Sequence, residues 1–270
     1  MGSVPSVLLR FRSKCRRFGV DHFGRRTLRI QATRPYVSFT FDDFPVSAFA
    51  EGGRILDKYG VRGTYFASLR LLGTSGASGQ IASSAHLADL VKHGHELGCH
   101  TFDHIDGSQS TVARFEESIE KNRVALAACV PGVVFRTFAY PLNGPTLPIK
   151  RAVGHRFVGC RGGGQTFNSG VIDLNLLKAY FLDFRTRDDL RAISAVIDEN
   201  AAARGWLIFA THDVCEEPSK YGCSSSAFEQ AVRLSLGSGA RVLPVKHVLQ
   251  ELDLTRNEIG SARQMIDERG

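Results

Sequence analysis

Short apolar runs alternate with amphipathic stretches along most of the chain. Runs such as VSFTF and WLIFAT have the length and the β-branched and aromatic content of buried strands. We therefore expect strands at 37–41, 61–66, 95–99, 135–140, 156–160, 178–182, 206–211 and 241–243. Between them the apolar positions repeat as on one face of a helix, which predicts helices at 51–59, 84–93, 110–129, 146–153, 187–203, 225–237 and 244–253.

Strands that alternate with helices of this length imply βαβ units and a parallel sheet. Seven or eight such units over about 220 residues fit a closed barrel better than an open sheet. The chain has 270 residues, 43% of them hydrophobic, which suffices for one large core. The fold class expected is therefore α/β, with the strands arranged as a barrel.

The positive charge is concentrated at one end of the chain. Residues 1–35 hold nine Arg or Lys against a single acid, Asp21, whereas the net charge of the whole chain is +7. We expect a basic N-terminal arm at 1–35, one folded domain at 36–253 and a charged tail at 254–270. The arm could contact anionic lipid or another acidic polymer, or it could be a solvated extension.

Targeting signals and cysteine usage both favour a cytoplasmic location. The apolar stretch SVLLRF is too short for a secretory signal, and no run approaches the ~20 apolar residues of a membrane helix. The six cysteines form no C-x-x-C pair, so free thiols are expected. Cys215 and Cys223 share one loop and are the pair that could bridge.

Polar groups gather where predicted strands end. The run PYVSFTFDDFPV ends in Asp42 and Asp43, while His100, Tyr140 and His212 each follow or end a later strand. Parallel barrels build their active sites at the carboxyl ends of strands. The two aspartates could serve different tasks there, and their sequence alone permits either assignment.

The segment GCHTFDHID contains a candidate metal site. His100 and His104 stand four residues apart, which can bring two imidazoles to one side of a turn. Two histidines and a carboxylate make a facial metal site with open positions, and Asp43 or Asp103 could be the third ligand. The alternative is a pair of surface or capping histidines.

The motifs TFDD, HTFDH, RTFAYP and THD, in this order, resemble the polysaccharide deacetylase family, the NodB-homology domain of carbohydrate esterases. The resemblance covers roughly residues 36–250 and implies a distorted (β/α)7-type barrel. SFTFDDFP, GWLIFATHDV and PSKYGCSSSAFE are similar to a bacterial branch that acts on exopolysaccharides and holdfast-like adhesins containing N-acetylglucosamine.

The resemblance also implies roles for individual residues. Asp42 matches the catalytic base, and the metal ligands implied are Asp43, His100 and His104. The ion implied is zinc, with cobalt or nickel as other candidates. A metal could polarise an acetamide carbonyl and activate the attacking water.

The later motifs imply three further roles. His212 matches the general acid, the backbone N–H of Tyr140 matches the oxyanion donor, and Arg136 could pair with Asp42 or form a structural salt bridge. The family commonly has an aspartate and a tryptophan that tune the acid histidine. Here the corresponding region offers Asp173 and Asp183 but no tryptophan, so that role stays unassigned.

The function expected is metal-dependent removal of N-acetyl groups from N-acetylglucosamine units, with release of acetate. The substrate would be a polysaccharide or a lipid-linked oligosaccharide, with peripheral membrane contact through the basic arm and no nucleic-acid partner. One alternative is an amidase of the same fold that acts on a small cyclic or linear amide. Another is a glycan-binding module without catalysis.

Overall fold

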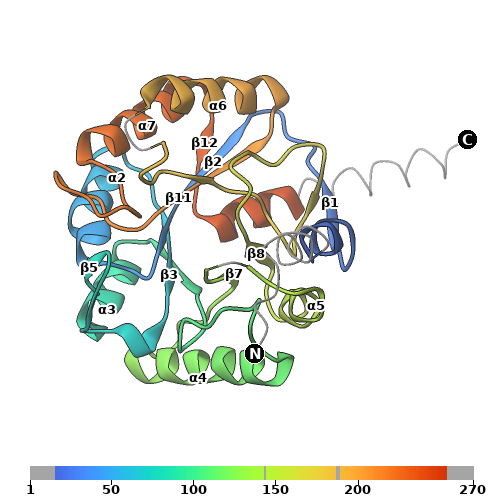
Figure 1. Ribbon diagram of the computed structural model, residues 1–270. Coiled ribbons are helices and arrows are strands. Elements are labelled where there is room, and N and C mark those ends of the chain that lie inside the picture. Colours follow the sequence, from blue (N-terminus) through green and yellow to red (C-terminus); the bar gives the residue numbers. More distant parts are fainter. Residues whose placement is uncertain (1–15, 143, 187–188, 254–270) are drawn as a thin grey trace, which may run out of the picture.

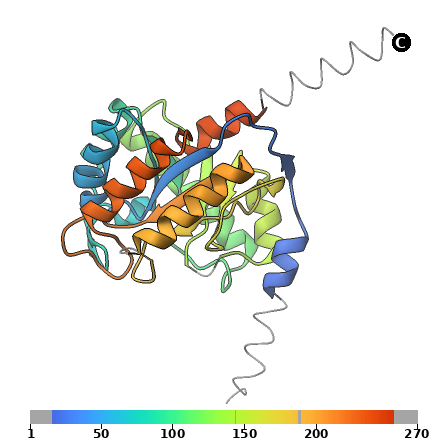
Figure 2. The same ribbon diagram turned by 90° about the horizontal axis from the view of Figure 1, so that it is seen from above.

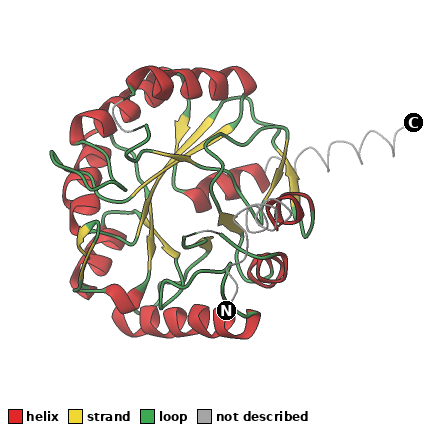
Figure 3. Cartoon of the chain, viewed as in Figure 1, coloured by secondary structure: helices red, strands yellow, loops and turns green. Residues whose placement is uncertain are grey.

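A curled, mostly parallel sheet lies at the centre of the molecule, inside a ring of helices (Figures 1 and 3). The computed structural model describes residues 16–142, 144–186 and 189–253. The predicted tail at 254–270 and residues 1–15 of the predicted arm lie outside the described residues. Among those described, no helix is long and apolar enough to cross a membrane.

Seven strands follow one another around the sheet in the order β10–β11–β2–β3–β6–β7–β8, and every pair is parallel. A further strand, β12, pairs with the start of β2. A parallel bridge between Arg161 and Leu177 joins β8 to the segment before β10. The predicted distorted barrel is confirmed, with strands β2 (Tyr36–Asp42), β3 (Thr64–Ala67), β6 (Glu96–Cys99), β7 (Thr137–Ala139), β8 (Gly159–Arg161), β10 (Tyr180–Phe181), β11 (Trp206–Thr211) and β12 (Arg241–Val242).

The surrounding helices agree closely with the apolar periodicity. They are α2 (Arg54–Lys58), α3 (Ser84–Lys92), α4 (Val112–Cys129), α5 (Leu147–Gly154), α6 (Leu190–Ala203) and α7 (Ser225–Gly237). The helix predicted at 51–59 is different, because its first part belongs to a π-helix, η1 (Ala48–Gly53). There Gly52 lies so close to Phe41 that a Cβ would stand 3.0 Å from the ring.

Three short features were not predicted. These are the two-stranded pairs β1 (Thr27–Arg29) with β9 (Val171–Asp173) and β4 (Ser75–Gly76) with β5 (Gly79–Gln80), and a 3-10 turn, η2 (Leu69–Leu71). Their two or three residues are too few for a hydrophobic period to be visible.

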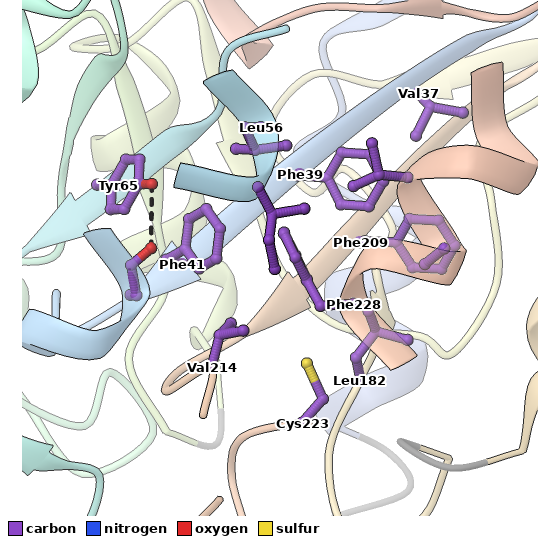
Figure 4. Close-up of a cluster of buried hydrophobic side chains, with 14 of the residues drawn as sticks. Val37, Phe39, Phe41, Leu56, Tyr65, Leu182, Phe209, Val214, Cys223 and Phe228 are labelled. Carbon is purple, nitrogen blue, oxygen red and sulfur yellow. Dashed lines mark hydrogen bonds between the residues drawn. The ribbon is translucent and has the colours of Figure 1, made fainter. Parts of the chain in front are cut away.

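Strand β2 is buried along its whole length. Figure 4 shows its apolar face, which carries Val37, Phe39 and Phe41. Phe39 and Phe41 pack against Phe228 of α7, with ring centroids 5.3 and 5.5 Å away. Alternate side chains point to opposite faces of a strand, so Ser38, Thr40 and Asp42 share the other face. Asp42 therefore points into the barrel.

The last described helix, residues 245–253, closes one end of the barrel (red in Figure 2). Its apolar side chains, Val245, Val248, Leu249 and Leu252, join the core cluster that contains Trp206. Its first turn is held by the buried Glu96, whose carboxylate accepts hydrogen bonds from the Lys246 N–H at 2.9 Å and from two threonine hydroxyls. Glu96 thus caps this helix from inside the barrel.

Residues 16–35, predicted as part of a basic arm, pack on the rest of the domain. The ammonium of Lys150 is fully buried, donates to the carbonyls of Val20 and Phe23, and lies 2.6 Å from a carboxylate oxygen of Asp173. Arg26 adds hydrogen bonds to the carbonyl of Phe157 at 2.7 Å and to its neighbour. The described part of the segment is therefore attached to the domain and is not a free extension.

Candidate active site

Asp42 and Asp43 lie at the carboxyl end of β2, where the backbone changes direction abruptly. Asp42 is the last strand residue, paired with Phe66 of β3. Asp43 and Phe44 both have a φ of 61°, in the left-handed region that non-glycine residues rarely adopt. Because of this turn the two carboxylates face different partners, Arg161 for Asp42 and two histidines for Asp43.

Asp43, His100 and His104 form a cluster whose ligand atoms all lie within 4.8 Å of one another. Nε2 of His104 is 3.2 Å and Nε2 of His100 is 3.8 Å from Oδ1 of Asp43. That oxygen is buried and has no hydrogen-bond partner among the residues that the structure describes. The predicted trio is thus brought together, with an orphaned carboxylate oxygen at its centre.

The ring of His100 is prepared to act as a ligand. Its Nδ1 lies 2.8 Å from the carbonyl oxygen of Ala139, and because that oxygen only accepts, Nδ1 carries a proton and Nε2 is left bare in the neutral ring. Burial lowers the pKa of His100 to about 4, so the neutral form prevails at neutral pH. Two imidazole nitrogens and one carboxylate are a ligand set that suits zinc and similar divalent ions.

The loop that carries the two histidines is fastened to helix α4. The Ser118 hydroxyl accepts from the backbone N–H of Phe102 and Asp103, at 3.1 and 3.0 Å, and donates to the Asp103 carboxylate. Asp103 also pairs with Arg70 at 2.8 Å, and this hydrogen bond lowers the pKa of Asp103. Asp103 therefore caps the loop, and Asp43 is the carboxylate that faces the histidines.

The partner of Asp42 is Arg161, not Arg136. A guanidinium nitrogen of Arg161 lies 2.5 Å from Oδ1 of Asp42, and both side chains are buried. Burial raises the pKa of Asp42, but Arg161, with smaller contributions from two nearby histidines, brings the pKa below its ordinary value. Arg136 lies exposed before β7. The pairing considered for Arg136 is therefore wrong.

Arg161 is fixed from both sides by aromatic rings. Its guanidinium lies 5.2 Å from the ring centroid of Phe66 and 5.5 Å from that of Phe181. Sequence reasoning missed this residue, because the strand was predicted at 156–160 and Arg161 lies one residue beyond that range. The available signal was its position at a strand end, the criterion that identified Asp42 and His212.

His212 follows β11 and faces the same centre. Its Nε2 lies 3.9 Å from Oδ2 of Asp43, and its ring packs beside that of Tyr221 with centroids 5.3 Å apart. Its Nδ1 is buried without a hydrogen-bond partner in the described part of the chain. The ring is thus positioned by packing and by a backbone hydrogen bond from its N–H to the Tyr221 carbonyl at 3.3 Å.

The aspartate beside His212 in the sequence, Asp213, and the two candidates Asp173 and Asp183 all have other partners. Asp213 accepts from the backbone N–H and the hydroxyl of Ser219, both at 2.6 Å, and so stabilises its own loop. Asp173 pairs with Lys150, and Asp183 pairs with Arg185 at 2.6 Å. The tuning aspartate common in the family has no counterpart among these three.

The Tyr140 amide is already used within the sheet. Its N–H donates to the carbonyl of Arg161 at 3.0 Å and so continues the pairing of β7 with β8. Its hydroxyl donates to the Asn175 carbonyl at 3.2 Å. This arrangement contradicts the predicted oxyanion donor, because the amide points along the sheet to β8.

The sequence of residues 29–156 matches the family model described as polysaccharide deacetylase. No curated protein matches the chain. Among solved structures, the CE4 domain of a multidomain xylanase from the hindgut metagenome of Trinervitermes trinervoides has a TM-score of 0.54 at 17% identity, over 81% of this chain and 91% of that chain. The chitin deacetylase of the fungal pathogen Colletotrichum lindemuthianum has a TM-score of 0.60 at 16% identity, over 81% and 89%.

A CE4 family pseudoenzyme from Bacillus anthracis has the same fold, with a TM-score of 0.58 at 13% identity, over 82% of this chain and 68% of that chain. At such identities a structural likeness shows the fold, and the pseudoenzyme shows that this fold does not require catalysis. The family match rests on the segment that contains Asp42, Asp43 and both loop histidines. Residues 29–156, just under half of the chain, are thus similar to the polysaccharide deacetylase family, and the chain shares its fold with solved CE4 structures.

Proposed function

We propose that the protein is a metal-dependent hydrolase that removes N-acetyl groups from N-acetylglucosamine units of a bacterial polysaccharide and releases acetate. The observation that carries this proposal is that the adjacent carboxylates of Asp42 and Asp43 have different partners. One carboxylate is held by a buried arginine, while the other faces two histidines with an orphaned oxygen. Binding of a glycan alone would need neither arrangement.

The metal would be held by Asp43 Oδ1, His100 Nε2 and His104 Nε2. A divalent ion there, zinc in our proposal, supplies Lewis-acid activation of the amide and of the attacking water. The residues fit such an ion, because His100 presents a bare nitrogen and Asp43 presents an oxygen that no other group satisfies.

The two remaining groups would move protons. Asp42, kept ionised by Arg161, would take a proton from the attacking water through its carboxylate. His212, in its protonated form, would give a proton to the departing amine through Nε2, the nitrogen that faces Asp43. Because the amide of Tyr140 donates to Arg161, no step is assigned to it.

We further propose that the substrate belongs to exopolysaccharide or adhesin synthesis and is met as a lipid-linked oligosaccharide in the cytoplasm. This rests on the motifs around Asp42 and His212 and on the basic N-terminal segment. Action on a finished chain outside the cell is the competing assignment. Fractionation of cells, followed by detection of the protein in each fraction, would decide between them.

The test is acetate release from chitooligosaccharide by zinc-loaded protein and by the variants Asp42→Asn and His212→Ala. Each variant is expected to lose roughly 100-fold or more in turnover. Full activity in either would contradict the role assigned to that residue. Unchanged activity in protein shown to be metal-free would contradict the metal site.

The same assay separates the other readings. Glycan binding without acetate release in the zinc-loaded wild-type protein would favour a binding module. Such an outcome would match the existence of a pseudoenzyme with this fold. Turnover of small cyclic or linear amides, with none of glycans, would favour an amidase.

A further inference from the structure

Residues 17–29 present exposed aromatic and basic side chains on one edge of the molecule. Phe18 is 60% and Phe23 is 54% exposed, and Arg17, Arg25 and Arg29 are also exposed. These five residues are here called the N-terminal surface. Figures 1 and 2 place the segment beside α5, outside the ring of helices.

The N-terminal surface is built on a fixed base. Val20 is buried against the domain, and Lys150 holds the carbonyls of Val20 and Phe23. The ring of Phe18 stacks on that of His22, with centroids 4.2 Å apart, on the side turned away from Val20. The exposure of the two phenylalanines thus follows from how the segment is attached.

The charge of this surface is almost entirely positive. The acid of the segment, Asp21, is paired with Lys178 at 2.9 Å. Arg29 lies opposite Val171 in the β1–β9 pair, and Val171 is itself 43% exposed. Arg29 therefore borders an exposed apolar side chain, and the N-terminal surface contains both cationic and apolar groups.

We propose that the N-terminal surface docks the protein on a membrane that contains anionic phospholipids. Arginines attract the lipid headgroups, while phenylalanine rings enter the boundary between headgroups and acyl chains. An acidic polysaccharide would use the arginines but leave the phenyl rings in water. Docking would hold the protein at the membrane surface, where a lipid-linked glycan is located. Membrane binding itself does not depend on catalysis.

The test is co-sedimentation of the full-length protein with vesicles of phosphatidylcholine alone or mixed with phosphatidylglycerol. Binding is expected only to the mixed vesicles and should weaken as salt is raised. The variant Phe18→Ser/Phe23→Ser should bind at least roughly tenfold more weakly. Arg17→Glu/Arg29→Glu should abolish binding, since it reverses two charges.

Matched controls change the same kinds of residue elsewhere. Phe184, 61% exposed, is replaced in Phe184→Ser, and two exposed arginines of α6 and α7 are replaced in Arg191→Glu/Arg233→Glu. Both controls should bind vesicles like the wild type, and thermal unfolding should show that all variants are folded. Equal binding to both vesicle types, equal loss in the controls, or binding to RNA or heparin in place of vesicles would overturn the proposal. None of these readouts involves acetate release, so they stand apart from the test of the proposed function.

Discussion

At the scale of single residues, the site depends on two adjacent aspartates with different surroundings. Like charges side by side would normally raise each other's pKa. Here Arg161 forms an ion pair with Asp42. The left-handed backbone at Asp43 and Phe44 turns the second carboxylate towards the histidines. The sequence left the assignment of the two aspartates open, and the geometry supports Asp42 for the proton and Asp43 for the metal.

Replacement of Arg161 should therefore be much more harmful than replacement of Arg136. Arg161→Ala leaves the buried Asp42 carboxylate unpaired, which should cost about 3 kcal/mol or more in the free energy of unfolding. It should also reduce acetate release at least roughly tenfold, because the pKa of Asp42 would rise. Arg136→Ala is the matched control, and urea unfolding with acetate assays would compare them. Equal effects of the two variants would contradict the ion pair.

His95 should make the stability depend on pH. Its side chain is buried, its Nδ1 accepts from the Gly63 N–H at 3.0 Å, and burial lowers its pKa from 6.5 to about 4. Between these values the unfolded chain binds a proton and the folded protein does not. Stability is therefore full above about pH 6.5 and falls by up to about 3 kcal/mol as the pH drops to 4.

The variant His95→Asn keeps an acceptor for Gly63 but cannot titrate. Urea unfolding of both proteins at pH 7.5 and pH 4 would show a smaller pH effect in the variant. The exposed His93 in the same turn, changed to Asn, serves as the control. An unchanged pH dependence in His95→Asn would refute the assignment.

At the scale of elements, helix α4 supports the histidine loop as well as the core. Besides Ser118, it places Asn122 beneath the loop, where the side chain accepts from the Leu69 N–H at 3.0 Å and donates to the Ala67 carbonyl at 2.9 Å. The helix thus ties the ends of β3 and β6 together. The proposed metal ligands His100 and His104 depend on this support, although α4 supplies neither of them.

Loss of the Ser118 hydroxyl should loosen the metal site. Ser118→Ala removes the acceptor for two backbone N–H groups of the loop, so zinc affinity should fall roughly 10- to 100-fold. Competition with a chromogenic chelator would measure the change. Ser226→Ala, at an exposed serine of α7, should leave affinity unchanged, and the same result for Ser118→Ala would contradict the role of α4.

The elements also show how far sequence reasoning reaches. α7 was predicted at its observed bounds, and β11 likewise, because a long apolar period or a long apolar run marks each. The predicted β8 starts three residues and ends one residue too early, since its apolar run starts before the residues that pair with β7. That shift left Arg161 outside the predicted strand. The positions of such short strands are decided by tertiary pairing, which local pattern does not contain.

At the scale of the whole molecule, the N-terminal segment is part of the domain. The buried ion pair of Lys150 and Asp173 joins this segment to the rest of the chain. A buried ammonium needs partners, and it finds two carbonyls and one carboxylate. The composition of residues 1–35 suggested a separate arm, since charge counts do not reveal which basic residues have structural partners. The strand order could not be read from the sequence for a similar reason, because β2 pairs with β11, which lies far along the chain.

Lys150→Met should detach this segment. The variant leaves Asp173 without its closest cation, so the free energy of unfolding should fall by about 3 kcal/mol or more. Trypsin should then cleave within residues 16–29 faster than in the wild type. Lys92→Met, at an exposed lysine of α3, should change neither property, and a protected segment in Lys150→Met would contradict the attachment.

The capping of helix 245–253 by Glu96 bears on the order in which the protein can be made. During synthesis, the hydrogen bond from the Lys246 N–H to the Glu96 carboxylate cannot form until residue 246 has been added. Likewise, β2 cannot pair with β11 until residues 206–211 have been added. A growing chain that ends at residue 156 would contain the three proposed metal ligands and Asp42, but it would lack Arg161 and β11, the strand on one side of β2. Folding must therefore be completed after nearly the whole chain has left the ribosome, and any partner that protects nascent chains would act on this protein late.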